Sequence, residues 1–307
     1  MKIVLFGRSG QVGWELQRSL APLGQIVALG SDCRDMCGDL GNSDGIVETI
    51  RRIAPDVIVN AAAHTAVDRA ESEPELAEAL NARAPGILAN EARRCGAFLV
   101  HYSTDYVFDG SGTRPWTETD ATGPLSVYGR TKLAGEQAIQ HSGCRYLLFR
   151  TSWVYAARGK NFAKTMLKLA GERDRLTVIS DQFGAPTGAE LLADVTALAL
   201  RQARNEPSVD GIYHLAASGE TSWHGFAAFV CEFARRAGMV LRATTIDPIP
   251  ATSYPTPAKR PLNSRLDTSK LRGTFDLWLP HWQDGVERML NEILCEKSSL
   301  KDPSHEK

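Results

Sequence analysis

Short apolar runs alternate with stretches of helical period through most of the chain. Each run has the length of a buried strand, and each periodic stretch has the apolar spacing of a helix that covers a sheet. This alternation predicts βαβ units and a parallel sheet buried on both faces, which is a doubly wound α/β fold. The predicted strands lie at residues 3–6, 26–29, 57–59, 98–101, 146–149 and 176–179. The predicted helices lie at residues 11–20, 45–53, 74–94, 128–140, 162–170 and 190–204.

The pattern changes beyond Asp210, where we expect a second and smaller α/β lobe. A strand at 211–215, an amphipathic helix near 222–237 and a proline-rich stretch at 247–261 predict this lobe, which would lie over a cleft. The expected boundaries are 1–155 and about 175–210 for the first domain, about 156–174 and 211–280 for the lobe, 281–295 for a C-terminal helix and 296–307 for a flexible tail.

Composition and charge narrow the class of protein. The 307 residues exceed the size at which one hydrophobic core stops growing, and 43% hydrophobic with 23% charged residues is typical of a globular protein. Basic residues number 35 and acidic residues 36, without a basic run, which argues against nucleic-acid binding. No window approaches the roughly 20 apolar residues of a membrane helix, and the apolar stretch after Met1 is too short for a signal segment. Six scattered cysteines without a C-x-x-C pair indicate free thiols. We therefore expect a cytoplasmic protein without nucleic-acid or membrane partners.

A glycine-rich turn follows the first predicted strand and opens the first predicted helix. Residues 7–13, Gly-Arg-Ser-Gly-Gln-Val-Gly, have the spacing G-x-x-G-x-x-G. Glycines at such a turn let the backbone approach a pyrophosphate, and the helix N-terminus offers N–H groups to it. The context predicts a dinucleotide-binding Rossmann domain, with the second lobe binding the substrate. The candidate cofactor residues outside the catalytic pair are Gly7, Gly10, Gln11, Val12, Gly13, Asp39, Leu40, Ala62, Ala63 and His64.

The end of the second predicted strand bears on which nicotinamide cofactor binds. An acidic residue about 20 positions after the glycines binds the ribose 2′-hydroxyl in NAD-type sites, and Asp32 stands in this region. Arg8, Ser31 and Arg34 are suited instead to a 2′-phosphate. We expect NADPH as the cofactor, with NADH also possible.

Tyr128 and Lys132 form the strongest catalytic signal together with Thr104 at a strand end. Residues four apart on a helix share one face, so the phenol and the ammonium are expected to point to the same spot. A lysine beside a phenol favours the phenolate, so we expect Lys132 to lower the tyrosine pKa from roughly 10 towards neutrality. The tyrosine would then exchange a proton with a carbonyl or alcohol, whose oxygen Thr104 would also bind.

At these residues the chain resembles the extended short-chain dehydrogenase/reductases, over nearly all of residues 1–295. Within that family it is similar to reductases of a 4-keto sugar carried on dTDP. The resemblance implies that NADPH delivers a hydride to C4 of dTDP-4-dehydro-L-rhamnose, giving dTDP-L-rhamnose for cell-surface polysaccharide such as the O-antigen of lipopolysaccharide. The stretches that carry the resemblance are 7–13, 60–68, 103–108, 128–132, 150–155, 182–187 and 260–264.

The resemblance also implies roles for single residues. Tyr128 would be the general acid, Lys132 would tune it and hold the nicotinamide ribose, and Thr104 would orient the C4 oxygen. The residues implied at the sugar are Thr65, Val67, Asp105 and Trp153, and those implied near the nucleotide are Arg260 and Asn263.

A metal-linked homodimer is a further implication of the resemblance. In it, exposed glutamates bind magnesium at the dimer interface, and the corresponding residues here are Glu15, Glu190 and Glu292. Carboxylate oxygens suit such a hard cation.

Three alternatives share the expected fold. A 4,6-dehydratase would carry Thr-Asp-Glu at the strand end, whereas Tyr106 stands here in place of the glutamate that eliminates water. A 4-epimerase would keep its cofactor and consume no reductant. A non-catalytic subunit that binds NADP, similar to the regulatory partner of methionine adenosyltransferase, would not need the intact set of Thr104, Tyr128 and Lys132.

Overall fold

A six-stranded parallel sheet forms the centre of the first domain and confirms the doubly wound α/β fold. The strand order is β10-β5-β4-β3-β1-β2. The chain therefore runs from β1 to β2 at one edge of the sheet, and then crosses back to form β3 on the other side of β1. The computed structural model describes residues 1–299. The strands of the sheet are β1 (Lys2–Phe6), β2 (Gln25–Leu29), β3 (Val57–Asn60), β4 (Phe98–Thr104), β5 (Arg145–Thr151) and β10 (Gly211–His214).

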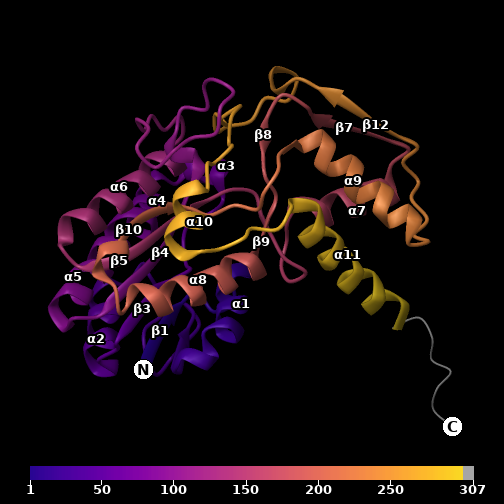
Figure 1. Ribbon diagram of the computed structural model, residues 1–307. Coiled ribbons are helices and arrows are strands. Elements are labelled where there is room, and N and C mark those ends of the chain that lie inside the picture. Colours follow the sequence, from indigo (N-terminus) through magenta and orange to yellow (C-terminus); the bar gives the residue numbers. More distant parts are fainter. Residues whose placement is uncertain (300–307) are drawn as a thin grey trace, which may run out of the picture.

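Both faces of the sheet are buried, which explains why its strands read as nearly continuous apolar runs. Alternate residues of β1 face opposite sides: Ile3 and Leu5 enter one hydrophobic core, and Val4 and Phe6 enter another. Figure 1 shows the helices on the two sides of this sheet. The first core is covered by α1 (Gln11–Ser19), α8 (Ala189–Ala203) and α10 (Ser269–Phe275), and the second by α2 (Ser43–Ile53), α5 (Ala84–Cys95) and α6 (Val127–Ser142).

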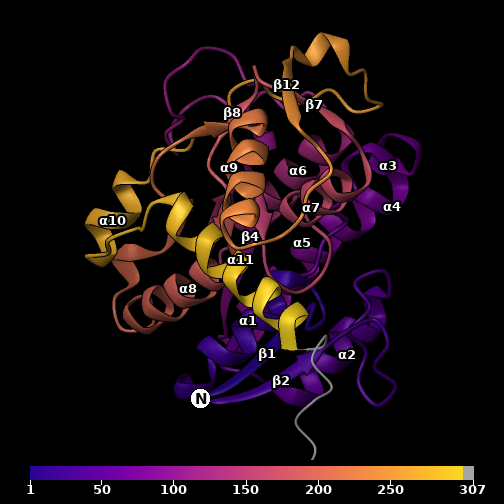
Figure 2. The same ribbon diagram turned by 90° about the vertical axis from the view of Figure 1, so that its right-hand side faces the viewer.

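The smaller lobe has its own cores and lies beyond the carboxyl ends of the sheet strands (Figures 1 and 2). A two-stranded parallel ribbon, β7 with β12, packs with two helices there, and two short strand pairs, β8 with β11 and β6 with β9, complete the strands outside the main sheet. The elements are β6 (Val154–Tyr155), α7 (Phe162–Glu172), β7 (Arg175–Ile179), β8 (Phe183–Gly184), β9 (Thr187–Gly188), β11 (Thr221–Ser222), α9 (Trp223–Arg236), β12 (Thr245–Ile249) and α11 (Trp282–Ser299).

Two strands belong to a different domain from the one that the sequence predicted. The strand at 175–179 was expected in the main sheet, but it pairs with β12 in the lobe. The strand at 211–214 was expected in the lobe, but it pairs with β5 at the edge of the main sheet, and the helix at 269–275 packs in the same core. The alternating burial of β7 gives the physical reason, because a strand exposed on one side fits a two-stranded ribbon better than a fully covered sheet.

The C-terminal helix was expected to end at residue 295, but α11 continues to Ser299. Part of the expected tail is therefore helical, and the remainder, residues 300–307, lies outside the described residues. Within residues 1–299, none of the helices has the length and apolarity needed to cross a membrane. The connections also contain α3 (Val67–Ser72), α4 (Pro74–Glu78), the π-helix η2 (Ala79–Arg83) and the 3-10 turns η1 (Ala21–Leu23), η3 (Asp105–Val107), η4 (Pro207–Val209) and η5 (Ala251–Ser253).

Candidate active site

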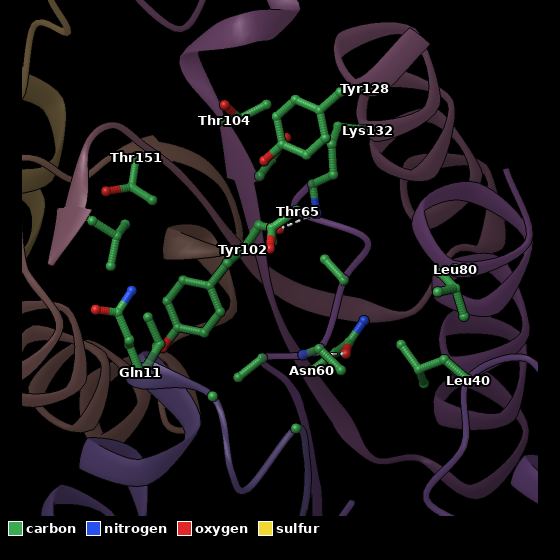
Figure 3. A pocket seen from close by; sticks show the side chains of 18 of the residues that line it. Gln11, Leu40, Asn60, Thr65, Leu80, Tyr102, Thr104, Tyr128, Lys132 and Thr151 are labelled. Carbon is green, nitrogen blue, oxygen red and sulfur yellow. Dashed lines mark hydrogen bonds between the residues drawn. The ribbon is translucent and has the colours of Figure 1, made fainter. Parts of the chain in front are cut away.

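A cavity of about 670 Å³ opens at the carboxyl ends of β1, β3, β4 and β5 (Figure 3). Ligands of open α/β sheets bind at this end, at the point where the strand order reverses, which here lies between β1 and β3. The candidate residues that line the cavity are Gly7, Gly10, Gln11, Val12, Asp39, Leu40, Ala62, Ala63, Thr65, Val67, Thr104, Asp105, Tyr128, Lys132 and Trp153.

The glycine turn brings the start of α1 directly to the cavity. Gly7 has φ +90°, and a Cβ there would lie 2.8 Å from the backbone of Ala61 and Ala62. A Cβ on Gly13 would overlap the carbonyl oxygen of Gly7, so the helix starts as close to the turn as its backbone allows. Gly10 caps the helix without a side-chain hydrogen bond, which leaves the first N–H groups of α1 available to an anionic ligand.

Residues at the end of β2 form the other rim of the glycine turn. Gly30 and Ser31 line the cavity. Arg8 and Asp32, which were expected to favour opposite cofactors, form an ion pair of 2.8 Å with each other and do not line it. Arg34 is also not among the lining residues. The charges of Asp32 and Arg8 therefore neutralise each other at this rim.

Helix α6 and strand β4 place the catalytic candidates. The helix begins after Ser126, whose hydroxyl accepts the N–H of Gly129 at 3.2 Å. Tyr128 and Thr104 both line the cavity, and Figure 3 shows their side chains beside each other. Figure 3 shows the tyrosine, the threonine and the side chain of Lys132 entering the cavity from these two elements.

The hydroxyl of Thr104 is bonded to the 3-10 turn that follows β4. It donates to Asp105 Oδ1 at 3.0 Å and accepts the N–H of Tyr106 at 3.2 Å. The ring of Tyr106 meets the ring of Tyr128 edge-on, with 5.5 Å between the centroids. The phenol of Tyr128 therefore packs against the same turn that holds the Thr104 hydroxyl.

The expected effect of Lys132 on the tyrosine was wrong in direction. Burial raises the pKa of Tyr128 to about 12, the hydroxyl of Thr104 opposes this rise, and the charge of Asp105 adds to it. The lysine Nζ instead donates to the carbonyl oxygen of Tyr102 at 2.5 Å, and burial lowers its pKa to about 8. The two residues do share a helix face, but the longer side chain reaches past the phenol to the backbone of β4. In this arrangement Tyr128 is a protonated acid at neutral pH.

Several buried polar atoms at the cavity have no hydrogen-bond partner among the described residues. They include Ser103 Oγ, Asp105 Oδ2 and Thr151 Oγ1, all on residues that line the cavity. Buried polar atoms are nearly always hydrogen-bonded, so these are groups that a polar ligand would satisfy. Together with the glycine turn, which leaves no room for a Cβ, they fit a dinucleotide cofactor with a polyhydroxylated substrate.

Two stacked tryptophans close the cavity on the side of the lobe. Trp153 follows β5 with φ +49°, a conformation that costs a residue with a side chain of order 1–3 kcal/mol. Its indole stacks on that of Trp223, with 3.6 Å between the ring centroids. Gly184 makes room for this stack, since a Cβ there would lie 2.9 Å from the Trp153 ring. Trp223 was missed in the sequence, because only the fold brings the start of α9 beside the end of β5.

The sequence model of one protein family, described as RmlD substrate binding domain, matches residues 1–295. The chain belongs to this family. Among curated RmlD-type relatives, dTDP-4-dehydrorhamnose reductase of Shigella flexneri is 61% identical over 293 residues, which cover 95% of this chain and 98% of that protein.

Solved structures similar to this RmlD-family chain agree in fold. The dTDP-4-dehydrorhamnose reductase of Clostridium acetobutylicum has a TM-score of 0.86 at 34% identity, covering 96% of this chain and 100% of that one. The enzyme of the same name from Bacillus anthracis, solved in complex with NADP, has a TM-score of 0.84 at 32% identity, covering 95% and 99%.

Four candidates of this RmlD-family chain do not line the cavity: Gly13, His64, Arg260 and Asn263. Gly13 acts through close packing on Gly7, as described above. His64 is buried. Its backbone N–H donates to Asn81 Oδ1 at 2.8 Å, and its ring Nε2 lies 3.4 Å from Glu73 Oε2.

Arg260 and Asn263 are engaged elsewhere in the described structure. The guanidinium of Arg260 makes two hydrogen bonds to Asp68, at 3.1 and 2.8 Å. The Asn263 side chain is buried and donates to the carbonyl oxygens of Ser111 and Arg114 at 3.3 and 2.8 Å. Asn263 therefore braces the loop between β4 and α6, whereas Arg260 ties its own segment to α3. Spacing in the sequence reveals neither contact.

The three glutamates expected at a magnesium site share a second cavity, of about 280 Å³, between α1, α8 and α11. Glu190 pairs with Arg288 at 3.2 Å, and Glu15 pairs with Arg18 at 3.5 Å. Residues 1–299 contain no group of three or more His, Cys, Asp or Glu side chains placed to hold a metal ion. The magnesium site was expected between two chains of a dimer, so the site at Glu15, Glu190 and Glu292 stays a prediction.

Replacing Gly13 by alanine tests the close approach at the glycine turn. The added Cβ would overlap the Gly7 carbonyl, so the helix start must move, and we expect the free energy of unfolding to fall by about 1–3 kcal/mol. Binding of NADPH, measured by calorimetry, should weaken at least tenfold. Gly171→Ala is the matched control, because nothing lies within 4 Å of a Cβ at that helical position. Equal behaviour of the two variants would contradict the packing role of Gly13.

Asp105 predicts a pH dependence of stability. Burial raises the pKa of its carboxyl from 3.8 to about 6, although the hydroxyls of Ser264 and Thr104 oppose the shift. Because the folded pKa is raised, ionisation opposes folding, and the cost appears as the pH rises from about 4 to above 6. Relative to the native chain, Asp105→Asn should therefore gain about 2 kcal/mol in free energy of unfolding between pH 4.5 and pH 8.

Urea unfolding of both proteins at the two pH values measures this difference, and groups that titrate alike in both cancel. A stability difference that does not change with pH would show that the Asp105 carboxyl titrates normally.

Proposed function

We propose that this chain reduces the C4 ketone of dTDP-4-dehydro-L-rhamnose to dTDP-L-rhamnose, with NADPH as the reductant. The observation that carries the proposal is that Tyr128 and Thr104 line the same cavity as the glycine turn. The names of the relatives, one of which was solved with NADP, support this choice of substrate and cofactor.

The chemistry divides between the cofactor and the side chains. Bound NADPH supplies a hydride to the carbonyl carbon of the substrate. The carbonyl oxygen then takes a proton, and the Tyr128 phenol carries one at neutral pH because burial raises its pKa to about 12. Thr104 lines the cavity beside that phenol (Figure 3), and we place it to hydrogen-bond the same oxygen. The stacked indoles of Trp153 and Trp223 would cover the sugar and exclude water.

Tyr106 is evidence against a reaction that eliminates water from the sugar. A dehydratase needs a carboxylate base at this position, and here a phenol packs against Tyr128 instead. Burial and the neighbouring Asp105 raise the pKa of Tyr106, so it stays protonated and does not act as a base. A reductase needs no base at this point.

The remaining alternatives differ in their use of reductant. A 4-epimerase would convert its sugar without net loss of NADPH absorbance, and a regulatory subunit would bind the cofactor without turnover. A reductase consumes one NADPH for each alcohol formed. An assay of NADPH absorbance with the dTDP-linked 4-keto sugar therefore separates a reductase from the other two, and analysis of the sugar product separates the epimerase from the regulatory subunit.

The proposal has four further parts, which concern the cofactor, the location, the oligomeric state and the use of the product. We propose that the protein also accepts NADH in place of its preferred NADPH, since the acidic Asp32 and the basic Arg8 both stand at the rim of the glycine turn. We also propose that the protein is a cytoplasmic homodimer and that its product enters cell-surface polysaccharide, such as the O-antigen of lipopolysaccharide. Free cysteines at positions 33, 37, 95, 144 and 231 support the cytoplasmic location.

Tyr128→Phe removes the proposed general acid and little else. We expect the rate of NADPH oxidation with the dTDP-4-keto sugar to fall at least about 100-fold, since general acid catalysis contributes that much or more. Affinity for NADPH, measured by fluorescence titration, should stay within a few-fold of the native value.

Tyr254→Phe serves as the control, because this tyrosine is exposed and does not line the cavity. It should keep full activity. Full activity of Tyr128→Phe as well would remove the phenol from the mechanism.

A further inference from the structure

His101 is a buried histidine that the proposed reaction does not use. It lies in the middle of β4, 1% exposed, and does not line the cavity. Its two ring nitrogens meet two residues that do line it: Nδ1 lies 3.1 Å from Asn60 Nδ2, and Nε2 lies 3.3 Å from Lys132 Nζ. The ring therefore connects the end of β3 to the lysine of the active site.

The hydrogen bonds of Asn60 decide which ring nitrogen carries the proton. Its Oδ1 accepts the N–H of Ala62 at 3.1 Å, so the amide NH₂ must face His101. The Nδ1 atom therefore accepts a hydrogen bond, and in a neutral imidazole the proton is then on Nε2. The ring is neutral because burial and the nearby Lys132 keep the pKa of His101 well below its usual value.

The Nε2–H group consequently points at Lys132 Nζ. An ammonium has only donors, so the two N–H groups would face each other, whereas a neutral amine accepts the histidine proton with its lone pair. The amine keeps a hydrogen to donate to the Tyr102 carbonyl, at 2.5 Å.

We propose that His101 is a positioning residue: Asn60 holds it in the Nε2–H tautomer, and it presents that N–H to Lys132 Nζ, which favours the amine over the ammonium. It thereby sets the pH above which Lys132 loses the positive charge that supports the phenolate left after proton transfer. The link to turnover rests on the proposed reductase function, whereas the tautomer does not.

Other charged and titratable groups near Lys132 act alongside the histidine. Glu136, one turn further along α6, favours the ammonium, but its carboxylate is engaged by Arg150 of β5 in a buried ion pair at 2.7 Å. Tyr128 on the same helix stays protonated, and the phenol of Tyr102 on β4 is bonded to Thr196. Asp105, at the end of β4, bonds to Thr104. None of these groups supplies an N–H to the lysine nitrogen.

Nitrogen-15 NMR of the native protein tests the tautomer directly. We expect the His101 ring to show a protonated Nε2 and an unprotonated Nδ1 from pH 6 to pH 9. A protonated Nδ1, or a charged ring in this range, would overturn the proposal. The measurement needs neither a variant nor turnover, so its result stands even if the reductase assay fails.

His101→Gln tests the effect on the lysine. The glutamine oxygen accepts a hydrogen bond from the ammonium, so we expect the pKa of Lys132, followed by its carbon-13 Cε shift, to rise by about one unit. The alkaline limb of the plot of kcat/KM against pH should move upward by the same amount. An unchanged lysine titration would overturn the proposal, and a shifted titration with an unchanged limb would overturn its link to turnover.

His214→Gln is the matched control. This histidine is also buried and neutral, since burial and Arg150 lower its pKa to about 3, but it lies on β10 and bonds to the Trp116 carbonyl at 2.9 Å. We expect it to change stability and to leave the Lys132 titration unmoved. A shift of equal size in both variants would show a general effect of losing a buried histidine, and would overturn the specific role of His101.

Discussion

The close seating of helix α6 on its neighbours is the constraint on which the candidate site depends. A Cβ on Gly129 would overlap the carbonyl oxygen of Tyr106, and one on Gly135 would overlap that of Asn81. Glycine at these two positions lets the helix backbone touch the 3-10 turn after β4 and the π-helix before α5. The side chains of Tyr128 and Lys132 then reach the end of β4 without crossing a gap. A helix displaced by one side-chain layer would separate the phenol from Thr104.

Burial at this contact sets the proton positions more strongly than the charge of the neighbouring lysine does. It raises the pKa of Tyr128 and lowers that of Lys132, so burial shifts both groups towards their neutral forms. Removal from water disfavours whichever form is charged. A neutral phenol is the form required to deliver a proton to a ketone oxygen, and the site holds it ready before the substrate arrives. The arrangement is therefore suited to reduction.

Local chemistry explains which features were visible in the sequence. Gly7 and Gly10 were found because a turn between strand and helix needs glycine at fixed spacing, and Tyr128 because helical periodicity relates it to Lys132. Trp223 was not found, because its role depends on where the lobe folds back. The direction of the tyrosine pKa shift was also missed, since spacing shows which residues are neighbours but not how far water is excluded.

Long-range pairing accounts for the errors in the fold. Strand β7 resembles a sheet strand in composition, and only its pairing with β12 places it in the lobe. In the same way, nothing local distinguishes Asn263 as a brace for a loop rather than a ligand for a nucleotide. Such features depend on contacts between segments far apart in the chain, to which periodicity and motif spacing are insensitive.

The stacked indoles have a consequence for how the two parts of the molecule can be observed. Trp153 belongs to the end of a sheet strand and Trp223 to the first turn of a lobe helix, and their ring centroids lie 3.6 Å apart. Aromatic rings this close share their electronic excitation, which produces a paired circular dichroism band that vanishes when the rings separate. This band therefore reports, in solution and without any label, whether the lobe and the sheet domain are in contact at these two indoles.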